Sequence, residues 1–243
     1  MRAPHWFSIR GFPYHHSASL TKLCHDLAVA ETISIDIWSD VVCPFCYLGS
    51  RQLALALELF KHHDDVVLNH HAFELDPRTP KNLEGSLAQL VAEKYQMPVE
   101  RAEALHQRLE TQAHELGMTW SFATARPTNT FDAHRLIALA ITQGLGQKMT
   151  QRLFAAYFSE GRLISDHEQL SRLAEEVGVT DASSLWATDA FTLDVRADEA
   201  AAQELGISGV PAVLVDSKFM VLGAQGVEKF VDVLRRAWER RAA

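Results

Sequence analysis

The chain has 243 residues, of which 47% are apolar and 22% charged, and these values are ordinary for one globular unit. Its 23 basic and 31 acidic side chains give a formal charge of −8, which opposes attraction to a polyanion, so we expect no nucleic-acid partner. No stretch approaches the ~18 apolar residues that a membrane span requires, so we expect no membrane partner either. Monomer and homodimer both remain open.

Residues 1–31 show none of the apolar periodicity that begins at Ile33. The tripeptide Ala28-Val29-Ala30 has the small-residue pattern of a signal-peptidase site, but Lys22 and Asp26 interrupt the apolar run that a secretory signal needs. We therefore predict an unstructured extension or a misassigned start, and a cytoplasmic protein.

Residues 33–73 predict a strand, a helix and a second strand, in that order. Isoleucines alternate with polar residues from Ile33 to Ile37, which is the period of two of a strand. After Pro44 the leucines follow helical spacing for about four turns. The segment from Val66 to Phe73 is rich in β-forming residues and follows a polar break, so it predicts the second strand.

From Pro77 to about Leu205 the sequence indicates helices and no convincing strand. Ser165 and Glu168 have the spacing of a capping box before one of these helices, and Gly178 is placed to end it. The pattern then changes again. Residues 212–215 and 219–222 predict a β-hairpin, and an apolar stripe after residue 227 predicts a closing helix.

This order of elements predicts an α/β thioredoxin-like fold, a mixed four-stranded sheet with a large all-helical insertion. Residues 32–76 and 190–243 are assigned to the thioredoxin-like domain. Residues 77–189 are assigned to the insertion, which we expect to act as a lid and to leave a substrate groove beside the sheet.

The segment Cys43-Pro44-Phe45-Cys46 falls where the first strand hands over to the first helix. The unpaired amides and the positive end of the helix dipole favour a thiolate on Cys43. Pro44 costs little there, because an amide in the first turn has no intrahelical acceptor. We therefore expect Cys43 to be an accessible, ionisable nucleophile.

Residues three apart on a helix have Cβ atoms ~5–6 Å apart, so Cys43 and Cys46 can form a disulfide after a small local adjustment. Cys43 is expected to exchange with substrate through a mixed disulfide, and Cys46 to resolve it. Phe45 places no charge between the two cysteines. We count Pro44 and Phe45 with the substrate-binding surface.

The cysteine pair has two alternative interpretations. A structural zinc site needs about four nitrogen or sulfur ligands, and the only candidates beside the pair are Cys24, His70 and His71. No second CxxC is present, so we predict no metal. A pair of inert, buried cysteines remains the other alternative, although loops at the ends of strands more often carry function.

Val210-Pro211 precedes the predicted hairpin and is the second indication of an active site. Proline cannot donate to a sheet ladder, so it belongs at a strand start or a bend. In a thioredoxin-like fold this point faces the helix that carries the cysteines. A cis bond there leaves the Val210 backbone free to pair with an extended substrate.

His134 and Arg135 lie on a predicted helix that begins after Asn129 or Thr130. They have two interpretations. The side chains can line the groove and hold an anionic group of the substrate, or they can belong to a solvated helix face.

Several segments together resemble the DsbA-like oxidoreductases, in particular the FrnE-type subfamily, which is related to the hydroxychromene-carboxylate isomerases. The resemblance runs from about residue 33 to residue 237. It implies a thioredoxin fold with a helical insertion, a reactive Cys43, a resolving Cys46 and a cis-proline at Pro211. The segments that carry it are 39–49 (SDVVCPFCYLG), 73–77 (FELDP), 129–130 with 133–135 (NT and AHR), 206–211 (GISGVP) and 223–225 (GAQ).

Two features limit this resemblance. Some FrnE-type proteins carry a further C-terminal cysteine pair, whereas this chain has no cysteine after Cys46. The isomerases and kappa-class glutathione transferases usually have serine where Cys43 stands. We therefore expect a thiol-disulfide oxidoreductase without a bound cofactor, acting on a protein or small-molecule disulfide or dithiol. The alternative is a glutathione-dependent isomerase or transferase, for which glutathione is the co-substrate.

Overall fold

The computed structural model describes residues 32–241. The predicted extension 1–31, with Cys24, lies outside the described residues. Four strands form one mixed sheet in the order β2-β1-β3-β4. β1 runs parallel to β2 and antiparallel to β3, and β3 pairs antiparallel with β4. The strands are β1 (Ile33–Ser39), β2 (Val66–Ala72), β3 (Ala212–Val215) and β4 (Phe219–Leu222).

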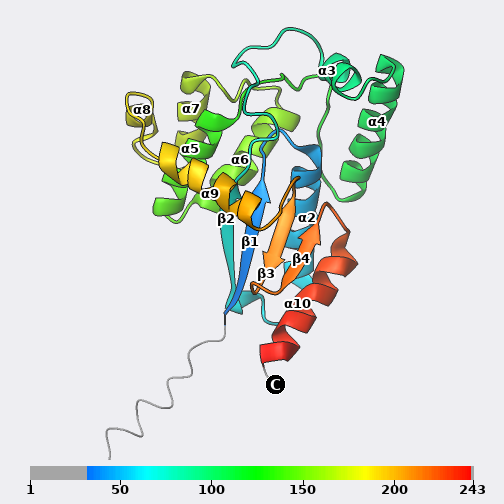
Figure 1. The fold of residues 1–243 in the computed structure, drawn as a ribbon, viewed down its shortest axis with the longest axis vertical. Helices are drawn as coiled ribbons and strands as arrows, with labels where there is room; N and C mark the ends of the chain where they lie inside the picture. Colours follow the sequence, from blue (N-terminus) through cyan, green and yellow to red (C-terminus); the bar gives the residue numbers. More distant parts are fainter. Residues whose placement is uncertain (1–31, 242–243) are drawn as a thin grey trace, which may run out of the picture. The chain divides into compact units, whose positions relative to one another are not determined.

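Between β2 and β3 the described chain contains helices and loops only, as the sequence predicts (Figure 1). This is the expected thioredoxin-like sheet with a helical insertion. The helices are α2 (Pro44–Leu59), the short 3₁₀ helix η1 (His63–Asp65), α3 (Leu87–Lys94), α4 (Val99–Glu115), α5 (Phe131–Thr142), α6 (Gly146–Phe158), α7 (His167–Val177), α8 (Ala182–Leu185), α9 (Thr192–Glu204) and α10 (Val227–Arg241).

One face of the sheet is covered by α2 and α10. The alternating isoleucines of β1 point into this layer and are at most 7% exposed, because a strand places every second side chain on one face. Each fully buried aliphatic or aromatic side chain here stabilises the fold by about 1.5–3 kcal/mol. The layer includes Ile33, Ile35, Ile37, Leu53, Val213, Val215, Phe230 and Leu234.

The other face of the sheet packs against α9. Trp38 lies in this second layer with Ala202 and Ile207, and its indole N–H donates to the carbonyl oxygen of Asp198 at 3.0 Å. The indole also stacks on the His71 ring with 4.5 Å between the ring centroids. The first strand is thus held from both sides up to its carboxyl end, where the cysteine loop begins.

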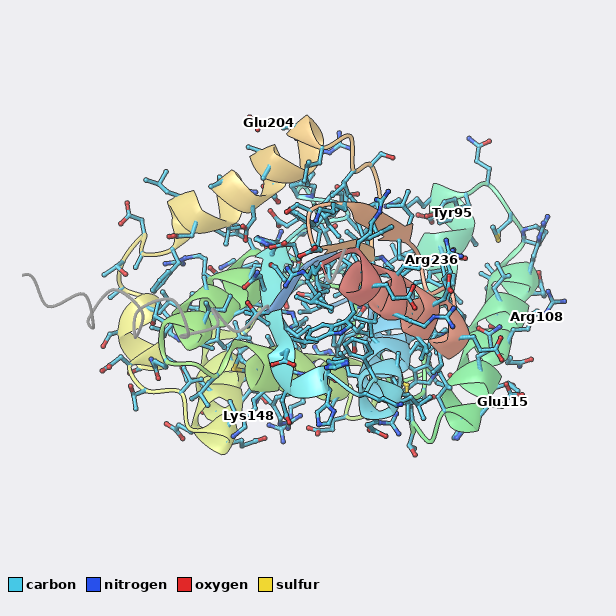
Figure 2. The ribbon with its side chains drawn as sticks, turned by 90° about the horizontal axis from the view of Figure 1, so that it is seen from below. Tyr95, Arg108, Glu115, Lys148, Glu204 and Arg236 are labelled. Carbon is cyan, nitrogen blue, oxygen red and sulfur yellow. The ribbon has the colours of Figure 1, made fainter. Side chains whose placement is uncertain are left out.

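A separate apolar core fills the helical insertion and extends to the cysteines. Leu153 and Phe154 of α6 and Leu170 of α7 are almost fully buried in it, and the same cluster includes Cys43 and Cys46. The cysteines therefore lie where the sheet meets the insertion. Charged side chains project outward from the peripheral helices, among them Arg108, Glu115 and Glu204 (Figure 2).

The predicted capping box of α7 is off by one residue. Asp166, not Ser165, is the N-cap, and its carboxylate accepts a hydrogen bond from the Gln169 amide at 2.8 Å. The Ser165 hydroxyl instead donates to the Lys81 carbonyl at 2.6 Å, which ties the loop after β2 to the segment before α7. Gly178 ends the helix with φ of 87°, as predicted.

Candidate active site

Cys43 is the N-cap residue of α2, and Pro44 is the first residue inside the helix. The Cys43 amide donates to the Asp40 carbonyl at 3.0 Å, which closes the turn after β1. The Cys43 carbonyl accepts from the amides of Cys46 (3.1 Å) and Tyr47 (3.2 Å). The sulfur-bearing residue therefore stands at the positive end of the helix dipole, where an anion is favoured. Both cysteines are free thiols.

The loop before β3 lies directly against this helix start. The Cys43 thiol donates to the Val210 carbonyl with an Sγ-to-oxygen distance of 3.6 Å. The Val210–Pro211 peptide bond is cis. Gly49 permits the close approach, because a Cβ at that position would lie 3.2 Å from Cγ of Pro211. The structure thus brings the CxxC segment and the Val-Pro segment together across 167 residues of sequence.

Exposure differs sharply within the CxxC segment. Phe45 is 48% exposed, Cys43 only 3% and Cys46 only 2%. Pro44 and Val210 are half-buried and Pro211 is buried. The predicted open access to Cys43 therefore needs correction, because the Val210 backbone and the apolar core of the insertion cover this residue. Phe45 is the part of the segment that is open to a partner.

Burial raises the pKa of the Cys46 thiol well above its ordinary value. The neighbouring Cys43 sulfur adds to this shift through a hydrogen bond and its charge, whereas a hydrogen bond from the Asp40 backbone amide lowers the pKa of Cys46. At neutral pH Cys46 is accordingly a protonated thiol, and it must lose its proton before it can act as a nucleophile.

Asp40 lies beneath the cysteine loop and is 1% exposed. Its carboxylate accepts a hydrogen bond from the Leu75 amide at 2.8 Å and pairs with His134 Nε2 at 3.3 Å. Burial, and then the charge of Asp40, raise the pKa of the buried Tyr157 hydroxyl above its usual range. The acidic group is therefore close to the helix start on one side and to α5 and α6 on the other.

The model of the DSBA-like thioredoxin domain matches residues 34–235. The chain belongs to the DsbA-like thioredoxin family. It is 34% identical to a probable DsbA oxidoreductase from Streptomyces coelicolor, with 85% of this chain and 90% of that one covered and a TM-score of 0.81. The uncharacterized protein YwbO of Bacillus subtilis (strain 168) is 29% identical over 206 residues, which are 82% of this chain and 94% of that protein.

A more distant DsbA-like structure is the cytosolic disulfide reductase DsbM from Pseudomonas aeruginosa. It is 18% identical, with 86% of this chain and 100% of that one covered and a TM-score of 0.58. At this identity the likeness shows the fold alone. In this DsbA-like chain, no helix of the described residues is long and apolar enough to cross a membrane.

His134 and Arg135 do not line an open groove, contrary to one interpretation of the sequence, nor do they form a solvated face. His134 is 3% exposed and faces Asp40, and Arg135 is 6% exposed. The Arg135 guanidinium donates to the Asp132 carboxylate at 3.0 Å and to the backbone carbonyls of Leu185, Thr188 and Ala190. Its donors are thus engaged inside the insertion, and none is directed to a substrate anion.

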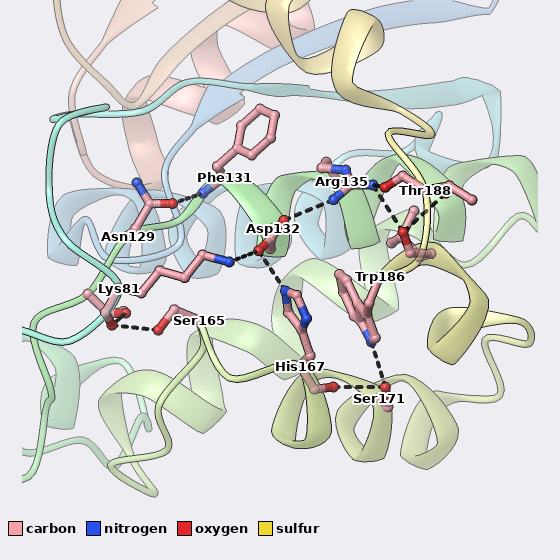
Figure 3. Close-up of polar contacts among 12 residues, drawn as sticks. Lys81, Asn129, Phe131, Asp132, Arg135, Ser165, His167, Ser171, Trp186 and Thr188 are labelled. Carbon is pink, nitrogen blue, oxygen red and sulfur yellow. Dashed lines mark hydrogen bonds and ion pairs between the residues drawn. The ribbon is translucent and has the colours of Figure 1, made fainter.

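Asp132 is the centre of a polar cluster in which Asp132 and Arg135 are buried, whereas the side chains of His167 and Lys81 are partly exposed (Figure 3). Its carboxylate accepts from Lys81 at 2.7 Å, from His167 at 2.8 Å and from Arg135 at 3.0 Å. These partners lower the pKa of Asp132 to about 2, although burial acts in the opposite direction. We call Asp132, Lys81, Arg135 and His167 the α5 clasp, because it joins α5 to α7 and to the loop after β2.

The candidate zinc ligands His70 and His71 lie on β2. His71 Nδ1 contacts Asp198 at 2.8 Å, and His71 Nε2 contacts Asp36 at 2.9 Å. Neither nitrogen of the buried His70 ring has a hydrogen-bond partner in the described structure. Within residues 32–241 no group of three or more His, Cys, Asp or Glu side chains is arranged to hold a metal ion.

Asp40 and Glu74 belong to the motifs behind the family resemblance, but no role for them was predicted from the sequence. Glu74 is 6% exposed, and its carboxylate pairs with Arg196 at 2.7 Å. Burial raises the pKa of Glu74, and Arg196 opposes that rise. The available signal was position alone, since Asp40 directly follows β1 and Glu74 comes two residues after β2, at the end of the sheet where Cys43 lies.

Proposed function

We propose that the protein is a thiol-disulfide oxidoreductase that exchanges a Cys43–Cys46 disulfide with a protein or small-molecule substrate. The observation that carries the proposal is the position of the Cys43 sulfur, at the start of α2 and 3.6 Å from the carbonyl that precedes Pro211. This arrangement supplies a site for a thiolate, a second thiol one helical turn away, and a backbone edge for a substrate chain.

In the reducing direction the Cys43 thiolate attacks one sulfur of a substrate disulfide. A Cys43–substrate disulfide forms and the other substrate sulfur leaves as a thiolate. Cys46 then loses its proton and attacks Cys43, so that the Cys43–Cys46 disulfide forms and the second substrate sulfur leaves. The protein dithiol is oxidised by two electrons and the substrate disulfide is reduced by two. The oxidising direction reverses these steps.

The contact between Cys43 and Val210 gives substrate binding a physical basis. In the free dithiol the Cys43 S–H donates to the Val210 carbonyl. When Cys43 ionises, that donor is lost and the carbonyl becomes available to an amide of an extended substrate. The exposed Phe45 ring offers apolar area beside the same edge. We infer that substrate approaches over Pro44 and Phe45 and displaces the cover over Cys43.

The relatives support the same class of activity. The Streptomyces protein carries the name of a probable DsbA oxidoreductase, and DsbM, which has also been solved with GSH, is named a disulfide reductase. Glutathione is therefore a reasonable small-molecule probe for this chain, either as exchange partner or as co-substrate.

The test compares Cys43→Ser, Cys46→Ser and, as matched control, Cys24→Ser. Cys43→Ser is expected to abolish exchange with oxidised glutathione, because it removes the attacking sulfur. Cys46→Ser is expected to accumulate a glutathione adduct on Cys43, visible as a mass increase in intact-protein mass spectrometry. Cys24→Ser should exchange like the wild type.

Wild-type exchange by both active-site variants would contradict the proposal. Full glutathione-dependent turnover by Cys46→Ser, without a trapped adduct, would instead favour the isomerase or transferase alternative, in which the second thiol is dispensable.

A further inference from the structure

Helix α9 leads directly into the loop that covers Cys43. Residues 205–211, which include the cis Val210–Pro211 bond, connect this helix to β3 (Figure 1). The Ile207 amide donates to the Ala202 carbonyl at 2.8 Å, which joins the loop to the last turn of α9. Ile207 and Val210 also pack in the same apolar cluster on this face of the sheet. The position of the Val210 carbonyl over the Cys43 thiol therefore depends on how α9 is held against the sheet.

Asp198, in the middle of α9, connects this helix to both of the strands that pair in parallel. Its backbone carbonyl accepts a hydrogen bond from the Trp38 indole of β1 at 3.0 Å. One oxygen of its carboxylate accepts from the Ala72 amide of β2 at 2.9 Å, and the other contacts His71 Nδ1 at 2.8 Å. The polar attachment of α9 to the sheet is thus concentrated at one residue and its partners.

The contacts of His71 require a positively charged ring. Its Nδ1 faces Asp198, and its Nε2 faces the Asp36 carboxylate of β1 at 2.9 Å. A carboxylate only accepts hydrogen bonds and a neutral imidazole has a single N–H, so both contacts are hydrogen bonds only when the ring carries two protons. Such charge-assisted bonds are roughly twice as strong as neutral ones. We call Asp36, His71 and Asp198 the α9 pin.

We propose that the α9 pin positions the Val210 carbonyl at the active site, and that loss of the His71 proton loosens residues 205–211 and uncovers Cys43. The inference rests on the proposed function, because it concerns access to the sulfur that begins the exchange. The three residues of the pin are positioning residues. They act through α9 and its loop and do not contact substrate.

The hydrogen bonds of His71 determine the direction of the pH dependence. Burial alone lowers the pKa of His71, but the hydrogen bonds to Asp198 and Asp36 outweigh burial and raise that pKa above 6.5. A raised folded pKa means that the stabilising contact is complete below the unfolded pKa and is lost as the pH rises through the folded one. The pin is therefore closed below about pH 6.5 and opens as the pH rises through the pKa of His71.

Other titratable groups face His71 besides Asp36 on β1 and Asp198 on α9. They are its neighbour on β2, His70, and His134 on α5, which lines the same small cavity. Burial lowers the pKa of His70 to about 4, so His70 stays neutral where His71 titrates. Both of these histidines are retained in every variant described below, and a changed pH profile is accordingly assigned to position 71.

Hydrogen–deuterium exchange of the Ile207 amide measures how firmly the loop is held. The reference amide is that of Val179, which donates to the Ala174 carbonyl at 2.9 Å at the end of α7. The ratio of the two protection factors cancels most of the intrinsic pH dependence of exchange. In the wild type this ratio should fall about tenfold as His71 loses its proton, the effect expected from one hydrogen bond to a charged group. Nuclear magnetic resonance of the ring follows the titration.

Two substitutions of His71 separate positioning by charge from packing of the ring. His71→Phe keeps an aromatic ring against Trp38 and removes both hydrogen bonds, so the protection ratio should be low at every pH. His71→Lys supplies a cation that stays charged to about pH 10, so protection should persist at about pH 9, where the wild type has lost it. A merely structural ring predicts instead that both substitutions lower protection equally at every pH.

His62→Phe is the matched control. His62 also stacks on a tryptophan, Trp238, with 3.8 Å between the ring centroids, and it also faces an aspartate, Asp65, at 3.7 Å. It precedes β2, whereas His71 lies near the end of that strand. This variant should show the protection ratio of the wild type throughout. Far-ultraviolet circular dichroism checks that each variant is folded.

The link from the pin to the active site is measured in a Cys24→Ser, Cys46→Ser background, where Cys43 is the only cysteine. Alkylation by iodoacetamide is followed by intact-protein mass spectrometry, and thiolate absorbance gives the ionised fraction of Cys43 at each pH. Per thiolate, His71→Phe should react about tenfold faster than the background protein at about pH 6. The two rates should converge at alkaline pH, where the background protein also loses the pin.

The outcomes separate the two proposals. A wild-type protection ratio that does not change as His71 titrates would overturn the pin, even if every variant fails to fold. A folded His71→Lys that loses protection over the same pH range as the wild type would do so too. Equal alkylation rates at about pH 6 would break the link to Cys43. If Cys43 does not exchange with oxidised glutathione although Ile207 follows the titration of His71, the proposed function is wrong and the pin stands.

Discussion

Helix α5 contributes one residue to each of two histidine–aspartate pairs, which differ in burial and in how their charge is balanced. In the α5 clasp, Asp132 accepts hydrogen bonds from Lys81, Arg135 and His167, and its pKa falls to about 2. Asp40, on the cysteine side, pairs with His134 and one backbone amide. The three donors around Asp132 make that carboxylate a structural joint, whereas Asp40 is held by one amide and one imidazole.

The largest effect is expected from breaking the clasp. Asp132→Asn leaves the buried Arg135 guanidinium without its counter-charge and should reduce the free energy of unfolding by about 3–5 kcal/mol at pH 7. The folded pKa of Asp132 lies below the ordinary 3.8, so its contribution is complete above about pH 4 and is lost as the pH falls through about 2. Urea unfolding across this range measures both the loss and its disappearance in acid.

The folded Asp132→Asn protein should still exchange disulfides, since the clasp does not contact the cysteines. A stability loss no greater than that of an ordinary surface substitution would show that the cluster is not a joint. Loss of exchange in a fully folded variant would show that the two pairs are coupled.

The sequence predicted the elements that local spacing determines. Alternating isoleucines indicated β1, and the change of period after Pro44 placed Cys43 at a helix start. The hairpin followed from two β-forming segments around a short polar turn, and the cis-proline followed from proline chemistry and the family resemblance. These predictions succeeded because strand and helix periodicity depend on neighbours in the chain. The assignment of 77–189 to the insertion and the FrnE-type subfamily stay predictions.

Burial of polar groups was not predictable in the same way. Charged side chains are seldom fully buried, so Arg135 was expected to face a cleft or solvent. Its carbonyl partners lie 50 to 55 residues away in sequence, and no local pattern shows them. The cover over Cys43 likewise comes from Val210, 167 residues away. Asp40 looks like an ordinary turn residue in the sequence. Its partners, Leu75 in the loop after β2 and His134 on α5, are 35 and 94 residues away.

His70 is a third case, because neither nitrogen of its imidazole has a hydrogen-bond partner in the described structure, unlike the paired His134 and His167. Burial lowers the pKa of His70 from 6.5 to about 4. The unfolded chain therefore binds a proton that the folded protein does not, and stability should fall by up to about 3 kcal/mol as the pH drops from about 6.5 to about 4. His70→Phe should flatten this slope, because it removes the titrating ring.

Urea unfolding at several pH values measures the slope. The matched control is His63→Phe, which removes an exposed imidazole in the η1 turn just before β2. This variant should retain the pH slope of the wild type. An unchanged slope in His70→Phe would assign the acid sensitivity to another group.

The smallest effect concerns Glu74, whose buried carboxylate is balanced by one partly exposed cation. Burial raises the pKa of Glu74, and the hydrogen bond and charge of Arg196 hold it down. Arg196→Met removes that balance and should cost about 1 kcal/mol at pH 8, a modest value because Arg196 is 46% exposed and screened by solvent. A raised folded pKa means that the folded protein keeps its proton longer than the unfolded chain. The cost should therefore shrink as the pH falls and Glu74 in the variant takes up a proton.

A double-mutant cycle with Glu74→Gln tests the assignment, since the neutral amide has no charge to balance. In that background Arg196→Met should have no pH-dependent effect on the free energy of unfolding. If the pH dependence persists there, Arg196 acts through its other partner, Glu199, which it contacts at 2.6 Å. The cycle thus decides whether the Glu74 carboxylate depends on Arg196 for its charge balance, as Asp132 depends on Arg135, or is stable without a cationic partner, as Asp40 is.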